Sequence, residues 1–121
     1  MINIIRLMNK IYTTPKLCCE VVLFYNKRIV NYDTLQRDSF IKICKDNYID
    51  THPCQLFYFF DSIGFKIAIL PIGNSEFWSG RIYHNGIITI SNDFVSRTQA
   101  TLWALDSSID FYENQYQKNN Q

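Results

Sequence analysis

The run Phe77-Trp78-Ser79-Gly80-Arg81-Ile82-Tyr83-His84-Asn85-Gly86-Ile87-Ile88-Thr89-Ile90-Ser91 decides the fold of this chain. It contains two segments rich in β-branched and aromatic residues, joined by the dipeptide Asn85-Gly86, which readily takes the two positive φ angles of a type I′ turn. The chain should therefore form a β-hairpin whose register is fixed by the turn, with Arg81 opposite Ile90. In this register one face carries Phe77, Tyr83, Ile88 and Ile90, and the other carries Trp78, Ile82, His84 and Thr89.

Segments upstream of the hairpin have a similar composition and are expected to add strands to the same sheet. They are rich in Val, Ile, Phe and Tyr and are bounded by turn residues such as Gly64 and Gly73. The predicted strands are residues 17–25 with a hairpin partner at 29–30, residues 56–60 and residues 65–70. Together with the hairpin they predict an antiparallel sheet of four to six strands.

Three segments have apolar residues at helical spacing and predict helices at residues 4–12, 34–48 and 97–116, although a strand is the alternative for the short first segment. Ser96 and Gln99 form a capping box at the start of the last helix. Ala100, Ala104 and Ser108 form a row of small residues on it, which would let this helix approach a sheet closely. The predicted fold class is α+β, with a long C-terminal helix and one or two further helices packed on the sheet.

Length and charge limit the classes of function. The 121 residues suit one domain, residues 1–121, whose tail at about 117–121 should fray. Twelve basic and eleven acidic residues leave a net charge of +1, which argues against a general polyanion binder. No segment has the continuous apolar stretch of a signal peptide or a membrane span, so we expect a cytoplasmic protein without a membrane partner.

The four cysteines are expected to be reduced thiols. Cys18, Cys19, Cys44 and Cys54 come without an export signal, and adjacent residues on a strand would point to opposite faces. The zinc-like spacing Cys-x-x-Cys is absent, and His52 with Cys54 is a weak substitute. We therefore predict neither a metal nor a cofactor.

Aromatic side chains are the strongest candidates for function. His84 is a candidate general base, but a histidine at a strand end beside a tight turn is more often structural. Large aromatic residues on both faces of a sheet leave one face exposed unless helices cover both, and an exposed aromatic face is typical of a protein-binding or self-association surface. The residues predicted to bind a partner are Tyr58, Trp78, Arg81, Tyr83 and His84.

The C-terminal half also carries two resemblances. A helix, strands and a last helix opening with Ser96-Arg97-Thr98-Gln99-Ala100 make residues 34–114 similar to the α-β-β-β-α order of double-stranded-RNA-binding domains. That resemblance implies RNA contacts at the start of the last helix, but Arg97 stands there beside Asp93 instead of a lysine cluster. The hairpin followed by an Arg-Thr-x-Ala helix also resembles small uncharacterised phage proteins, which implies a virus–host context.

The leading functional hypothesis is a non-enzymatic binding protein that acts stoichiometrically on a host protein or ribonucleoprotein complex, as an anti-CRISPR-type inhibitor does. Seventeen Ile and eleven Asn against three Ala are typical of an AT-rich gene, which is compatible with a phage or mobile element. One alternative is RNA binding, with Arg37, Lys42, Lys45 and Arg97 as phosphate contacts. The others are an antitoxin or immunity protein and a small enzyme centred on His84.

Overall fold

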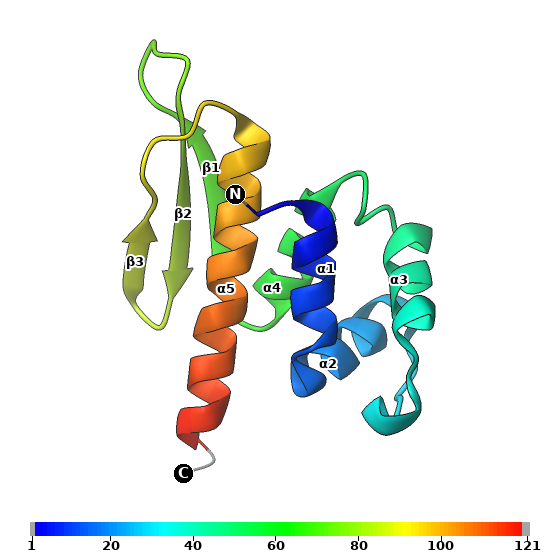
Figure 1. Cartoon of the computed structure of the whole chain (residues 1–121). Coiled ribbons are helices and arrows are strands. Elements are labelled where there is room, and N and C mark those ends of the chain that lie inside the picture. The colour runs from blue at the N-terminus through cyan, green and yellow to red at the C-terminus, as the bar shows by residue number, and fades with distance from the viewer. Residues whose placement is uncertain (1, 120–121) are drawn as a thin grey trace.

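The computed structural model describes the backbone of residues 2–119 and the side chains of residues 2–115. Within those residues the chain forms five α-helices and a three-stranded sheet (Figure 1). The helices are α1 (Ile4–Tyr12), α2 (Pro15–Asn26), α3 (Arg37–Asp46), α4 (Leu56–Ser62) and α5 (Arg97–Asn119), and the strands are β1 (Lys66–Pro71), β2 (Trp78–His84) and β3 (Ile87–Ile90). The fold class is thus α+β, as predicted.

The sheet is an antiparallel meander in the order β1-β2-β3, and its hairpin is the predicted one. Asn85 and Gly86 have φ angles of 52° and 75°, as a type I′ turn requires. Arg81 lies opposite Ile90, and Tyr83 lies opposite Ile88, so the predicted register is confirmed. Beyond the hairpin, Trp78 forms an isolated antiparallel bridge with Phe94, which returns the chain toward α5.

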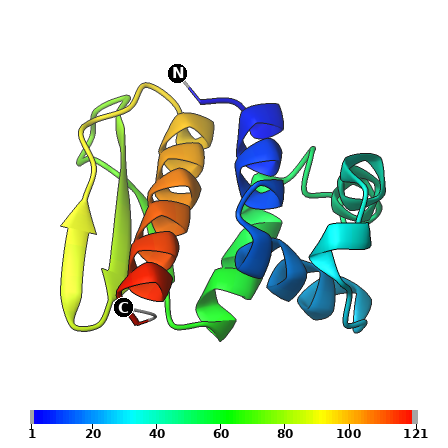
Figure 2. The ribbon, with the colours of Figure 1, turned by 60° about the horizontal axis from the view of Figure 1, so that its bottom comes forward.

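The elements are stacked in layers, with the sheet on the outside (Figure 2). The long helix α5 lies across one face of the sheet and contacts β1 and β2, and α1 and α4 lie on its other side, followed by α2 and α3. No described element covers the opposite face of the sheet. The predicted packing of the C-terminal helix on a sheet is therefore confirmed.

The predicted count of four to six strands is wrong, because two predicted strands are helices. Residues 17–25 belong to α2, where the buried residues are Leu17, Cys18, Val21 and Val22. Residues 56–60 belong to α4, where Leu56, Phe59 and Phe60 are buried. Both sets repeat at intervals of three and four residues, which fits one face of a helix and outweighs the strand propensity of the individual residues. Ile29 and Val30 lie outside any strand, because Lys27 ends α2 in the left-handed conformation with φ 56°.

The core is built mainly by helices. The core lies between α5 and the four earlier helices. Among the described residues, Ile82 is the one strand side chain that is both apolar and buried. Gly80 provides the close contact between sheet and helix, since a Cβ atom there would lie 2.8 Å from Cε3 of Trp103 and 3.2 Å from the carbonyl oxygen of Ala100. The sheet is therefore attached to the helical core along one face only.

Helix α5 begins and ends near its predicted bounds. The Ser96 hydroxyl accepts a hydrogen bond of 3.1 Å from the backbone N–H of Gln99, as expected of the predicted cap. Ala100, Ala104 and Ser108 are buried. The helix continues to Asn119, past the predicted end at 116, and residues 120–121 of the predicted frayed tail lie outside the described residues.

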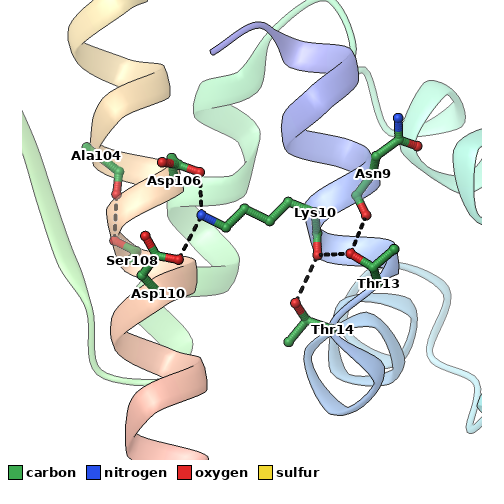
Figure 3. A network of polar contacts seen from close by, with 8 residues as sticks. All are labelled: Asn9, Lys10, Thr13, Thr14, Ala104, Asp106, Ser108 and Asp110. Atoms are coloured by element: carbon green, nitrogen blue, oxygen red, sulfur yellow. Dashed lines mark hydrogen bonds and ion pairs between the residues drawn. The ribbon is translucent and has the colours of Figure 1, made fainter. Parts of the chain in front are cut away.

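A salt bridge joins the first and last helices (Figure 3). Nζ of Lys10 on α1 lies 2.6 Å from Asp106 and 2.7 Å from Asp110, one turn apart on α5. Two nearby hydroxyls donate hydrogen bonds to backbone carbonyl oxygens, Ser108 to that of Ala104 and Thr14 to that of Lys10. The bridge therefore fixes α1 against the helix that carries the sheet.

Candidate binding surface

The uncovered face of the sheet is the most distinctive surface of the molecule. Ile82 and Gly80 of β2 point toward α5, so the alternate residues of each strand point away from it. The outward set consists of Lys66, Ala68 and Leu70 from β1, Ser79, Arg81 and Tyr83 from β2, and Ile88 and Ile90 from β3, and of these Ser79 is buried. We call this set the open face.

The open face exposes apolar side chains on its two outer strands, and we call these side chains the apolar band. Leu70 is 39% exposed, and Ile88 and Ile90 are each 57% exposed. Single exposed apolar residues are ordinary, but three on the two outer strands of one sheet face, on either side of β2, are typical of an interaction surface. None of the outward residues is acidic, and the two charged ones, Lys66 and Arg81, are both cationic.

Arg81 stands in the middle of this band. It lies between Ala68 on β1 and Ile90 on β3 and is half-buried. Its Nε atom is buried and has no hydrogen-bond partner among the described residues. A guanidinium offers planar, paired N–H donors that match a carboxylate or a phosphate, so this side chain is set up to accept an anionic group.

A hollow adjoins the open face at the turn end of the hairpin. Its volume is about 350 Å³, and Lys66, Tyr83, Asn85 and Ile88 are among its lining residues. Tyr83 and Lys66 lie opposite each other across β2 and β1. The hollow therefore lies beside Ile88 of the apolar band and is bordered by the phenol ring of Tyr83 and the cation of Lys66.

The structure divides the five residues predicted to bind a partner among three places. Arg81 and Tyr83 lie on the open face. Trp78 lies on the face toward α5, where the Arg97 guanidinium sits 4.4 Å from its ring centroid. Tyr58 is 68% exposed on α4. His84 also belongs to the α5 side, so the five fall into the pair Arg81 and Tyr83, the pair Trp78 and His84, and Tyr58 alone.

His84 has the surroundings of a structural residue. Its ring stacks on Phe65, with 3.8 Å between the centroids and 7° between the planes. Nδ1 lies 3.2 Å from the carbonyl oxygen of Gly64. Nε2 lies 2.8 Å from the amide of Gln115 on α5. Both ring nitrogens are thus engaged, which favours an anchoring role over that of a free general base.

The residues predicted to contact nucleic acid do not form one site. Arg37, Lys42 and Lys45 are exposed on α3, whereas Arg97 starts α5 on the far side of α1 (Figures 1 and 2). Arg37 donates to Asn9 at 2.8 Å, and Lys42 pairs with Asp46 at 2.8 Å. The guanidinium of Arg97 lies over the ring of Trp78. These four cations therefore do not form a continuous basic stripe.

The cysteines are free thiols in different environments. Burial, with smaller contributions from neighbouring thiols, raises the pKa of Cys18 to about 12. Burial and the charge of Asp50 raise the pKa of Cys44 to about 12 as well. Cys54 is exposed. Within the described residues, no three His, Cys, Asp or Glu side chains are grouped as metal ligands.

Sequence reasoning missed the β1 part of the open face. Lys66 and Leu70 fall in a segment that was predicted as a strand, and their outward position follows from the register with β2. The available signal was the alternation 66, 68, 70, but residues 72–77, which form a turn from Ile72 to Ser75, are a longer connection than the two-residue loop that fixes a register from sequence.

Within residues 2–119, no helix is both long enough and apolar enough to cross a membrane.

In comparisons with known proteins, the chain matches no protein-family model, no curated protein and no solved structure. The resemblances to double-stranded-RNA-binding domains and to small phage proteins therefore stay predictions.

Proposed function

We propose that this protein acts by binding another protein through the open face of its sheet, with Arg81 at the centre of the interface. The observation that supports the proposal is Arg81, whose Nε has no hydrogen-bond partner among the described residues, placed between exposed apolar side chains. Arginine and tyrosine surrounded by aliphatic side chains are characteristic of the energetic centre of protein interfaces.

The charges on the open face specify the chemistry of the partner. Lys66 and Arg81 are its charged residues, and both are cationic. A guanidinium at the centre of a protein interface is best satisfied by a carboxylate, which matches its planar, paired N–H donors. The partner should therefore offer an Asp or Glu side chain surrounded by apolar residues.

The specific form of the proposal is a stoichiometric inhibitor or modulator of a host complex, of the anti-defence type. It rests on the composition and on the resemblance to small phage proteins. Such an inhibitor works by occupying a surface, so its effect should saturate when it equals its target in number. An effect on a purified nuclease at far lower ratios would contradict this form of the proposal.

Photo-crosslinking at two tyrosines tests where a partner binds. p-Benzoylphenylalanine replaces Tyr83 on the open face or, as a matched control, Tyr58 on α4. After irradiation in nuclease-treated host lysate, the Tyr83 derivative should give a discrete adduct with a partner protein, and the Tyr58 derivative should not. The adduct mass separates a partner from a second copy of the chain. An adduct from Tyr58 alone would contradict the proposal.

Two charge reversals test the role of Arg81. Arg81→Glu should abolish recovery of the crosslinked partner, because it sets a carboxylate against the partner's carboxylate. Lys45→Glu makes the same change of charge at an exposed position on α3 and should leave recovery unchanged. Equal recovery by both variants would refute the assignment to the open face. Recovery that disappears after nuclease treatment would instead support the RNA-binding prediction.

A further inference from the structure

The outer edge of β3 is an unpaired strand edge. In a two-residue hairpin, His84 and Ile87 beside the turn exchange main-chain hydrogen bonds, and bonded and non-bonded pairs then alternate. The bond of 2.9 Å from the N–H of Ser91 to the carbonyl oxygen of Gly80 continues this alternation. The N–H and C=O groups of Ile88 and Ile90 therefore point away from β2, and no described element lies beyond β3 (Figure 2).

The β3 edge also lacks the usual protection of edge strands. Folded proteins guard such edges with charged side chains, proline, bulges or a covering element. Residues 85–92 contain neither a charge nor a proline, and Ile87 is 66% exposed. The opposite edge differs, because β1 begins at Lys66, ends at Pro71 and contacts α4. Of the two edges, β3 is therefore the one that can accept another strand.

We propose that β3 pairs with β3 of a second copy of this chain, antiparallel and around a two-fold axis at Thr89. In a continuous sheet, residues directly opposite each other point to the same side. A residue on the open face can therefore pair only with a residue of the second copy that also points to the open face. The axis at Thr89 places Ile88 opposite Ile90 of the second copy and, by symmetry, Ile90 opposite its Ile88. The outward N–H and C=O groups of both residues then bond to each other.

This register matches side chains as well as hydrogen bonds. Four isoleucines, two from each copy, form one apolar cluster on the open face. Thr89 meets Thr89 of the second copy on the face toward α5, which is a favourable cross-strand pair. A pairing of the same surface on both copies is the isologous contact of a two-fold dimer. The strand is uncharged and each chain carries a net charge of +1, so electrostatic repulsion between the two copies is small.

The dimer contains a six-stranded sheet whose open face is continuous across both copies. Arg81 and Tyr83 of each copy stay on that face, one strand in from the junction, so the surface proposed for partner binding is doubled and remains available. Because β3 has four residues, the contact is short and the dimer should dissociate reversibly on dilution.

A charge-pair experiment tests both the dimer and its register. Sedimentation equilibrium of the purified chain should show an average mass that rises with concentration from one chain toward two. Ile88→Lys and Ile90→Glu should each stay at the mass of one chain, because each places a charge opposite an isoleucine. In an equal mixture the introduced lysine faces the introduced glutamate, so the two variants should associate at least about tenfold more tightly than either does alone.

Controls at the other edge of the sheet complete the test. Leu70→Lys and Leu70→Glu change a residue of the same open face on β1, and both should associate as the wild type does. Circular dichroism confirms that each variant is folded. A wild-type mass of one chain up to about 1 mM would overturn the dimer. Single variants at positions 88 and 90 that associate like the wild type, or a mixture without gain, would overturn the proposed pairing.

Discussion

The imidazole of His84 lies flat on the ring of Phe65, 3.8 Å from centroid to centroid. The same imidazole reaches the carbonyl oxygen of Gly64 and the side chain of Gln115. One side chain at the end of β2 thus joins the sheet to the turn after α4 and to the distal half of α5. Because the core contains little of the sheet, this anchor should be important for holding the hairpin in place.

Replacing His84 should therefore reduce stability. His84→Ala removes a stacked ring and two hydrogen bonds, so we expect the free energy of unfolding to fall by about 1–3 kcal/mol. Urea denaturation followed by circular dichroism measures the change. His52→Ala is the matched control, since His52 is exposed and its ring contacts the hydroxyl of the adjacent Thr51, and it should change stability little. Equal effects from both substitutions would contradict the anchoring role.

Gly80 should not tolerate a side chain. The Cβ of Gly80→Ala would lie 2.8 Å from the Trp103 ring and 3.2 Å from the Ala100 carbonyl oxygen, so α5 must shift away from β2. Overpacking of this kind costs about 1–3 kcal/mol, measurable as a lower urea midpoint. In a Trp103→Leu background the ring contact is absent, and the added cost of Gly80→Ala should shrink. A cost that does not depend on Trp103 would contradict this account.

The hairpin could be predicted from sequence residue by residue, because Asn85-Gly86 fixes both the turn and the register. The helix α5 could be predicted from its cap and its apolar spacing. The predicted separation of Tyr83 from Trp78 and His84 on the two faces of β2 is confirmed. Which alternation faces solvent could not be predicted, because that depends on the face that α5 covers.

The helices α2 and α4 show where local composition misleads. Val21, Val22 and Phe24 favour a strand individually, and so does the run of aromatic residues from 57 to 60. Burial by the surrounding helices selected the helical spacing instead. Pro15 at the first position of α2 was a usable signal, since proline is favoured there. Short apolar runs carry both periodicities, and tertiary contacts decide between them.

Alkylation should distinguish the four thiols. Cys18 and Cys44 are fully buried, and their pKa values are raised to about 12. The reagent therefore cannot reach them, and they are not ionised to the reactive thiolate near pH 8. Iodoacetamide at about pH 8 should label Cys54 first, and peptide mapping by mass spectrometry identifies the order. In about 6 M urea all four should react at similar rates. Early labelling of Cys44 in the folded chain would contradict its burial.

The buried thiols also predict a loss of stability at alkaline pH. Above its ordinary pKa of 9.0 the Cys44 thiol ionises in the unfolded chain, whereas burial keeps it protonated in the folded chain up to about 12. The unfolded state then binds fewer protons, so the free energy of unfolding falls between about pH 9 and pH 12. Cys44→Val removes this contribution, and its urea midpoint should fall less than that of the wild type between about pH 8 and pH 10.5. Cys54→Ser should behave as the wild type does.

The bridge from Lys10 to Asp106 and Asp110 should contribute modestly to stability and depend on salt and pH. Its side chains are 30%, 29% and 52% exposed, so Lys10→Met should lower the free energy of unfolding by about 0.5–1 kcal/mol, and about 1 M salt should reduce the difference. Partial burial acts to lower the pKa of Lys10, but the hydrogen bonds to the two carboxylates outweigh it and raise that pKa above 10.5. The contribution is therefore complete below pH 10.5 and is lost as the pH rises through the folded-state pKa. Lys42→Met, which breaks a more exposed pair within α3, is the control and should cost less. An equal cost for both substitutions would mean that the bridge does not hold α1 against α5.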